Sequence, residues 1–286
     1  MVDVDILRNR LEQYRATNIA EEDHAMREIL QEYVLAALTR TDFFAKAAFH
    51  GGTHLRIFHG LRRFSEDLDF ALLSPNISFE LKPYLSAIKS ELVSIGLEVE
   101  VADKANGEAQ VKKAFVKEGS LVRMLSVQYH APRGGRSPRK LQIKIEVDAN
   151  PPAGAKTEMK LLRFPFRASV ANYDLSSSFS GKLHALLCRP YVKGRDWYDF
   201  DWYAGNRVAP NIPLLSSAIY QNGPWEGLQF GIDAAWIQRE MISKITSLDW
   251  KAAKEDLEPF VREEERGILD SFNVQYFTAI AKDLFR

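Results

Sequence analysis

The sequence predicts two halves of different class: an α+β half that ends at about residue 172, and an all-α half after it. Apolar side chains recur every three or four positions over residues 4–40, which is the spacing of amphipathic helices. Residues 97–171 instead alternate apolar and polar side chains and are rich in β-branched residues, which predicts antiparallel strands. Helical spacing returns at residue 175 and continues to the end of the chain. We therefore expect one domain over residues 1–172 and a helical domain over residues 173–286.

Turn residues divide the first half into elements. A short apolar segment at residues 47–49 precedes a glycine pair, a helix of one or two turns and the strand-like sequence DLDFALL. An amphipathic helix is expected to start after Ser78 and to end at Gly96. Strands are expected over residues 97–103, 110–117, 120–131 and 140–149, with RGGRSPRK as the turn before the last of them.

The composition narrows the class of protein. The chain has 286 residues, a formal net charge of zero and one cysteine, Cys188. A single cysteine excludes an internal disulfide framework and a cysteine-rich zinc site, and it fits a reducing compartment. No apolar run approaches the roughly 20 residues of a membrane helix, and the acidic N-terminal sequence is unlike a signal peptide. We expect a cytoplasmic protein with no membrane partner.

The segment FHGGTHLRIFHGLRRFSEDLDFAL, residues 49–72, begins with a glycine pair ahead of a short helix. Gly51 and Gly52 let the backbone turn sharply and approach a ligand, and Thr53 adds a hydroxyl to the unpaired N–H groups of a helix start. Such a start is a natural cradle for phosphate oxygens. The alternative is a plain tight turn in which Thr53 caps the helix. Both interpretations stay open on these residues alone.

Two acids in the same segment predict a metal site. Asp67 and Asp69 alternate on a strand, so their carboxylates share one face while Leu68 and Phe70 face the core. Two like charges at this spacing raise each other's pKa unless a cation lies between them. A divalent cation with oxygen ligands, Mg²⁺ or else Mn²⁺, meets that need. The alternative is an exposed acidic strand face.

A third acid of the same kind occurs in KLQIKIEVDA, residues 140–149. Glu146 and Asp148 fall on its polar face, opposite a face of Leu, Ile and Val side chains. If this strand lies beside the first, one of the two acids completes a cluster of three carboxylates. Such a cluster suits phosphoryl or nucleotidyl transfer, because metal ions then activate the attacking hydroxyl and steady the leaving pyrophosphate.

A second block, SGKLHALLCRPYVKGRDWYDFDWY, places further charges on helices. Lys182 offers a point charge to a triphosphate, and Arg189 or Arg195 offers a planar fork. Asp196 and Asp199 are three residues apart and so occupy neighbouring positions on a helix. The alternatives are solvated charges, or a structural pair between Arg195 and Asp199.

These two segments resemble the AbiEii/AbiGii-type toxins, nucleotidyltransferase-like proteins of the DNA polymerase β-like superfamily. The superfamily pairs a Gly-Ser helix start, here Gly52 and Thr53, with Asp-x-Asp on the next strand and a third acid on a later one. The second segment is similar to the family's Lys-Leu-x-Ala-Leu, Arg and Arg-Asp-x-Tyr-Asp block. The resemblance covers residues 25–205. It implies a polymerase β-like fold with a mixed or antiparallel sheet, and a helical half that contributes to the active site.

The resemblance also implies roles for single residues. The implied catalytic residues are Asp67, Asp69, Glu146, Lys182 and Asp196. The implied nucleotide-binding residues are Gly51, Gly52, Thr53, Ser65, Lys182, Arg189 and Arg195. The implied metal ligands are Asp67, Asp69 and either Glu146 or Asp148, of which Glu146 aligns better with the family's strand.

The implied activity is metal-dependent transfer of a nucleoside monophosphate from an NTP to RNA, with the tRNA 3′ end as the expected acceptor. Growth arrest, a role in phage defence and a cognate antitoxin follow from the same resemblance. A cluster of basic residues forms either a solvated loop face, which is the commoner case, or a surface that binds RNA phosphates and so favours RNA as acceptor: Arg133, Arg136, Arg139, Lys140, Lys156, Lys160, Arg163 and Arg167. A protein side chain or a small hydroxyl compound as acceptor is the alternative, and a nucleotide-binding protein without turnover is another.

Overall fold

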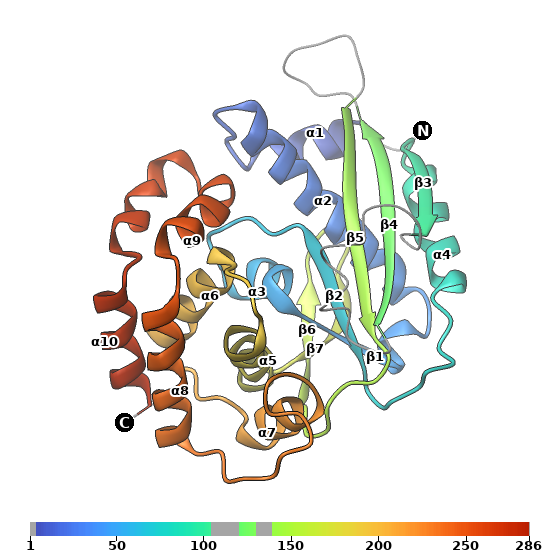
Figure 1. Ribbon diagram of the computed structural model, residues 1–286. Coiled ribbons are helices and arrows are strands. Elements are labelled where there is room, and N and C mark those ends of the chain that lie inside the picture. The colour runs from blue at the N-terminus through green and yellow to red at the C-terminus, as the bar shows by residue number, and fades with distance from the viewer. Residues whose placement is uncertain (1–3, 104–119, 130–138, 286) are drawn as a thin grey trace. The chain divides into compact units, whose positions relative to one another are not determined.

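The computed structural model describes residues 4–103, 120–129 and 139–285, and they form two compact units (Figure 1). The first unit comprises Met1–Gly60, Phe64–Pro151 and Glu158–Asn172. The second comprises Leu61–Arg63, Pro152–Thr157 and Tyr173–Arg286. The expected division of the chain into domains at residue 172 stays a prediction. In the described part of the chain, no helix combines the length and the apolar character needed to cross a membrane.

Within the described ranges, the first unit is built on a mixed sheet of seven strands. Its strands are β1 (Ala47–His50), β2 (Asp67–Leu72), β3 (Glu98–Asp103), β4 (Ser120–Tyr129), β5 (Arg139–Asp148), β6 (Thr157–Leu162) and β7 (Ala168–Tyr173). Their order across the sheet is β3-β4-β5-β2-β1-β7-β6. β3, β4 and β5 pair antiparallel, as predicted, and so do β1 and β2. β2 runs parallel to β5, and β1 parallel to β7. The predicted mixed α and β fold is therefore confirmed.

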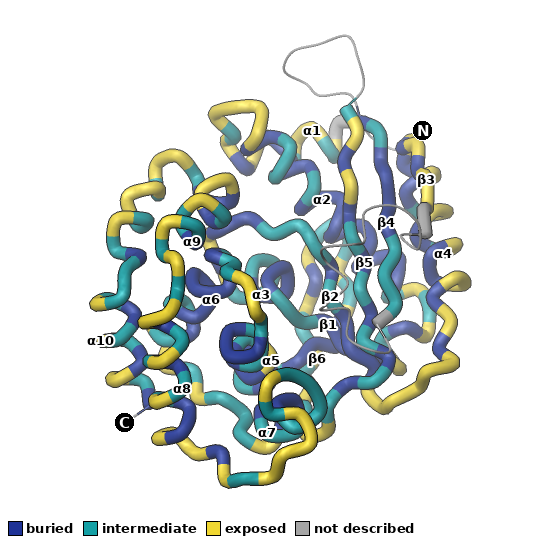
Figure 2. Tube along the Cα trace, viewed as in Figure 1, coloured by how far each residue is buried: buried dark blue, intermediate teal, exposed yellow. Residues whose placement is uncertain are grey.

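The α-helices described in the first unit are α1 (Val4–Glu12), α2 (Ile19–Thr39), α3 (Gly51–His59) and α4 (Lys82–Ser94). A single 3₁₀ turn, η1 (Phe43–Ala45), leads into β1. α2 lies against β5 and α4 against β3, and α2 is buried over most of its length (Figure 2). α4 begins at Lys82 instead of directly after Ser78, because Pro83 is suited to the first turn of a helix. The predicted strand at 110–117 and the turn at 133–140 fall mainly outside the described residues.

The second unit is helical. Its α-helices are α5 (Leu175–Cys188), α6 (Gly194–Gly205), α7 (Ile212–Gln221), α8 (Ala234–Ser247), α9 (Trp250–Leu257) and α10 (Val274–Leu284). The 3₁₀ segments η3 (Glu258–Phe260) and η4 (Glu263–Ser271) lie between α9 and α10. Aromatic rings of α6 form its core, since Trp197 and Phe200 are buried and contact Phe277 edge-on and tilted respectively. These helically spaced aromatics therefore pack the core.

His54 of α3 is a fully buried titratable group in the first unit. Its ring lies 5.9 Å from that of Phe49, and its Nε2 lies 3.2 Å from Nε2 of His59. Burial, reinforced by the charge of His59, lowers the pKa of His54 well below its ordinary value. The neutral imidazole is therefore the form that the folded chain keeps.

We expect His54 to make the protein less stable in mild acid. Because the pKa of His54 is lowered in the folded chain, the unfolded chain takes up a proton at a pH at which the folded chain does not. The free energy of unfolding therefore falls as the pH drops through the pKa of the unfolded chain, near 6.5. The loss is up to about 1.4 kcal/mol per pH unit. Denaturant unfolding at pH 7.5, 6.5 and 5.5 should therefore give a smaller acid loss for His54→Leu than for wild type. Equal losses in the two proteins would contradict this assignment.

Candidate functional site

The two acids of β2 and the acid of β5 lie together on one face of the sheet. Leu68 and Phe70 are buried, so Asp67 and Asp69 point to the opposite face, as predicted. β2 and β5 are parallel neighbours, and their register places Asp69 beside Glu146. Residues in register on adjacent strands point to the same side, so three carboxylates share this face. The expected juxtaposition of the two strands is confirmed.

The same register separates the two candidates for the third acid. Asp148 lies beside Ala71, one step of alternation further along β5 than Glu146. Its Oδ1 accepts a hydrogen bond of 3.0 Å from the backbone N–H of Asn150, in the turn that follows the strand. Glu146 is therefore the acid that neighbours the pair on β2, while Asp148 stabilises the end of the strand.

Lys144 is a cation within this group of acids. It lies beside Asp67 in the register, and its Nζ forms an ion pair with Glu146. Burial alone would lower the pKa of Lys144. The negative charges of Glu146, Asp67 and Asp69 outweigh this effect, so the pKa is raised above its ordinary value. The local sequence gave no reason to choose this lysine, because it shares its polar strand face with Gln142 and the two acids.

The three acids are the type of ligand that a divalent metal prefers, although their side chains do not converge on one point. All three acids present oxygen donors, which Mg²⁺ and Mn²⁺ prefer. Over residues 4–103, 120–129 and 139–285, no three His, Cys, Asp or Glu side chains converge as a metal site would require. Glu146 is instead paired with Lys144. Glu146 would have to exchange that ammonium group for the metal.

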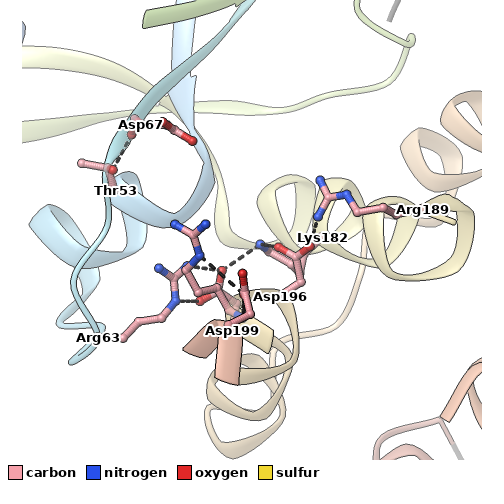
Figure 3. Close-up of polar contacts among 9 residues, drawn as sticks. Thr53, Arg63, Asp67, Lys182, Arg189, Asp196 and Asp199 are labelled. Carbon is pink, nitrogen blue, oxygen red and sulfur yellow. Dashed lines mark hydrogen bonds and ion pairs between the residues drawn. The ribbon is translucent and has the colours of Figure 1, made fainter. Parts of the chain in front are cut away.

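The glycine pair positions Asp69 and begins α3. Gly51, with φ of +83°, is the first residue of the helix, so Thr53 lies in the first turn and is not the cap. A Cβ on Gly51 would come within 3.1 Å of Cβ and Cγ of Asp69, and its Oδ2 is nearer still. The buried Thr53 hydroxyl donates to the Asp67 carbonyl oxygen at 2.5 Å (Figure 3). The hydroxyl thus joins α3 to β2, and phosphate binding by this helix start stays a prediction.

We expect Gly51→Ala to cost more than an ordinary glycine replacement. Gly51 has a positive φ and also meets Asp69, whereas Gly60, with φ of +74°, has nothing within 4 Å of an added Cβ. Gly60→Ala should cost about 1–2 kcal/mol for the backbone conformation. Gly51→Ala should cost roughly 1–3 kcal/mol more, because it also displaces the Asp69 side chain. Urea unfolding of both variants measures the difference, and equal losses would show that the Asp69 contact is unimportant.

The second unit holds a buried network of ion pairs around the two aspartates of α6 (Figure 3). Lys182 of α5 donates to Asp196 at 2.6 Å and lies 2.7 Å from Asp199. Arg189, which follows α5, also pairs with Asp196. Lys182 and Asp196, which were predicted from one sequence block, are thus in direct contact. Lys182 and Arg189 meet at one carboxylate although they lie seven residues apart in the sequence.

Arg63 completes this network and was not predicted. Its Nε and Nη2 donate to the two oxygens of Asp199 at 2.7 and 2.6 Å. Arg63 is 3% exposed and Asp199 is 0% exposed. Burial alone would raise the pKa of Asp199, but Arg63 and Lys182 lower it below its ordinary value. Asp199 is therefore a structural anion, and the alternative pairing with Arg195 is wrong.

Asp196 is held ionised in the same way. Burial opposes its charge, but Lys182, Arg189 and Lys193 together hold the pKa of this carboxyl far below its ordinary value. Such a group cannot take up a proton near neutral pH. It acts as a fixed negative charge that orients Lys182.

Two further residues implied by the resemblance have other contacts. The guanidinium of Arg195 lies 4.0 Å from the ring centroid of Phe260, and its Nε is 3.7 Å from Asp256. Ser65 lies in the connection between α3 and β2, and its carbonyl oxygen accepts a hydrogen bond of 3.2 Å from Gln31. Nucleotide binding by Ser65 and Arg195 stays a prediction.

Several members of the predicted basic cluster are already paired with acids. Arg139 lies 3.1 Å from Asp23, and Lys140 lies 3.0 Å from Glu100. Lys160 is 3.1 Å from Glu158 within β6. Arg133 and Arg136 fall outside the described residues. The three paired cations are balanced locally, which weakens the argument for a continuous phosphate-binding surface.

A solved structure described as a candidate nucleotidyltransferase from H. pylori agrees with the fold; it is 16% identical, with 91% of this chain and 93% of that chain covered and a TM-score of 0.51. The second is JHP933 from Helicobacter pylori, also 16% identical, with 92% and 91% covered and a TM-score of 0.49. No curated protein matches the chain.

The family is shown by its sequence model. The model for the nucleotidyl transferase AbiEii toxin of type IV toxin–antitoxin systems matches residues 33–278. This match spans both units, including β2, β5, α5 and α6. Because most of its length is matched, the chain belongs to the AbiEii family of nucleotidyl transferase toxins.

Proposed function

We propose that this chain transfers a nucleoside monophosphate from an NTP to a hydroxyl group of RNA, with the tRNA 3′ end as acceptor, and thereby arrests growth. The observation that carries the proposal is the placement of Asp69 beside Glu146, with Asp67 on the same sheet face. An acidic face of this kind is what nucleotidyl transfer needs to hold metal ions against phosphate oxygens.

In the proposed reaction, the acceptor oxygen forms a bond to the α-phosphorus while the bond from that phosphorus to the bridging oxygen breaks. Pyrophosphate leaves, and the hydroxyl proton passes to solvent or to a carboxylate. Mg²⁺ or Mn²⁺, when bound, would lower the pKa of the attacking hydroxyl and neutralise the charge on pyrophosphate. Asp67, Asp69 and Glu146 are the residues that would hold it.

The other proposed roles belong to groups that bind phosphate. The backbone N–H groups at Gly52 and Thr53, in the first turn of α3, would donate to phosphate oxygens. Lys182 and Arg189 would supply positive charge in the second unit, where Asp196 orients both of them. The choice of RNA as acceptor is based on the family alone, because several residues of the predicted basic cluster are paired with acids.

Two further proposals follow from the family. Toxins of type IV systems are encoded with an antitoxin, so a cognate antitoxin is the expected protein partner. A part in phage defence is the expected cellular role. Co-expression with the gene beside it should relieve growth arrest, and arrest that persists with every neighbouring gene would contradict the pairing.

Purified protein incubated with each α-labelled NTP, Mg²⁺ and total tRNA tests the reaction directly. We expect label in RNA with Mg²⁺, no label with EDTA, and recovery when excess Mg²⁺ is restored. Label on protein would replace RNA by a side-chain acceptor. NTP binding with no label on any acceptor, for all four nucleotides and with metal present, would favour a nucleotide-binding protein without turnover.

A further inference from the structure

Positive charge exceeds negative charge around the first turn of α6. The carboxylates of Asp196 and Asp199 are shared by three cations, Arg63, Lys182 and Arg189. Lys193, the residue before α6, is a fourth cation close enough to lower the pKa of Asp196. Among the residues that the structure describes, these four cations therefore face the two carboxylates of α6 in a region from which water is largely excluded. Such an imbalance is costly unless a further anion is bound.

Lys193 is the member of this group whose charge is least compensated. Its side chain is half-buried, and within the described ranges no hydrogen bond or ion pair holds its ammonium group. Burial lowers the pKa of Lys193, and although Asp196 opposes this, Arg195, Arg189 and Lys182 lower it further. The folded chain therefore disfavours the charge of Lys193, and at neutral pH that cost reduces stability.

Arg189 carries a second sign of incomplete pairing. One of its Nη atoms binds Asp196, but its buried Nε has no acceptor in the part of the chain that the structure describes. Lys244 donates to the backbone carbonyl of Arg189 at 2.7 Å, which fixes the position of this residue after α5. A fixed guanidinium with an unused donor is suited to a ligand that brings acceptor oxygens.

The backbone next to Lys193 is also closely packed. Gly194 begins α6, and an added Cβ would come within 2.8 Å of the carbonyl carbon of Ala253 in α9, with the carbonyl oxygen nearer still. The glycine therefore lets α6 pack directly on α9. This contact holds the backbone of Lys193 in place while its side chain stays unpaired.

We propose that Lys193 binds the polyphosphate tail of the substrate together with Lys182 and Arg189, an inference that rests on the proposed function. A polyphosphate tail carries several negative charges and many acceptor oxygens, so it balances the excess of cations. A nucleoside monophosphate has fewer negative charges and so balances less of this excess positive charge. Lys193 would therefore help the site to select triphosphates over monophosphates.

This role has a consequence that a structural role does not share. If Lys193 serves a ligand, its removal relieves repulsion in the ligand-free protein and weakens binding of the anion. If it supports the fold, its removal lowers stability. Lys193→Met is therefore expected to raise the melting temperature of the free protein by roughly 2 °C or more. The same change is expected to weaken polyphosphate binding by about 10- to 100-fold.

Inorganic tripolyphosphate is the probe, with binding to the full-length protein measured by calorimetry and melting measured with and without the anion. Lys251→Met is the matched control, because Lys251 lies on α9 with 87% of its side chain exposed and should behave as wild type. Lys193→Arg should keep most of the affinity. A lower melting temperature for Lys193→Met, or unchanged tripolyphosphate affinity, would overturn the proposal, as would a wild type that does not bind tripolyphosphate.

The labelled-nucleotide reaction separates this proposal from the proposed function. Tripolyphosphate binding that depends on Lys193, in a protein that transfers no nucleotide, would support the anion site and reject the transfer. Nucleotide transfer in which Lys193→Met leaves the KM for NTP unchanged would support the transfer and reject the role of Lys193. Comparison of ATP with AMP in the binding assay tests the selection of triphosphates. Lys193→Met should weaken the binding of ATP much more than the binding of AMP.

Discussion

Asp69→Asn is expected to lower the rate of nucleotidyl transfer by at least about a thousand-fold, with the fold retained. Asparagine has the size of aspartate, so its neighbours Gly51 and Glu146 are not displaced. It lacks the negative charge that a divalent metal requires on this face. Because one of three like charges is removed, the melting temperature of the metal-free protein should stay the same or rise.

Two comparisons sharpen this test. Glu66→Gln removes a charge from the same segment, but Glu66 lies 3.6 Å from Arg27 and is not among the three acids, so transfer should fall less than about ten-fold. Glu146→Gln should match Asp69→Asn, whereas Asp148→Asn should not. Initial rates with labelled NTP measure all four variants. A rate for Asp69→Asn within ten-fold of wild type would remove the carboxylate cluster from the mechanism.

Arg63→Met is expected to lower the free energy of unfolding by roughly 3–5 kcal/mol. The change leaves Asp199 in the core of the second unit with Lys182 as its remaining cation, and Lys182 is shared with Asp196. Both oxygens of Asp199 lose their donors from Arg63. A buried carboxylate that loses a bidentate partner pays a large desolvation cost.

The neighbouring arginine is the matched control. Arg62 has 75% of its side chain exposed and lies 3.0 Å from Glu265, so Arg62→Met should cost at most about 1 kcal/mol. The double variant Arg63→Met/Asp199→Leu should recover part of the loss, since it leaves no unpaired carboxylate. Urea unfolding of the four proteins tests the argument, and similar losses for the two single arginine variants would refute it.

The acidic face could be predicted from local pattern up to a point. Alternation along a strand is a property of the chain itself, so DLDF places Asp67 and Asp69 on one face in any fold that makes it a strand. The partner acid depends on which strand lies beside it. β2 and β5 are separated by β3, β4 and α4 in the sequence, and only the assembled sheet places Glu146 rather than Asp148 beside Asp69.

Arg63, Lys144 and Lys193 could not be identified in this way. Arg62 and Arg63 are adjacent and identical in type, yet one is exposed and the other buried. The difference arises from a partner 136 residues further along the chain. Lys144 is one of the alternating polar residues of an ordinary strand. Only its neighbours on the adjacent strand β2 make it part of an acidic cluster. In each case the distinguishing contact is absent from the local sequence.

The chain contributes three residues, Leu61–Arg63, to the second unit before the first unit is complete. Because of this early segment, the second unit is not one continuous stretch of sequence. A fragment that starts after residue 172 would contain Lys182 and both aspartates of α6 but not the guanidinium that Asp199 binds. A recombination event that exchanged the helical half as a single cassette would join Asp199 to an unrelated connection between α3 and β2. A change of sequence in that connection is therefore constrained by a partner on a helix more than a hundred residues away.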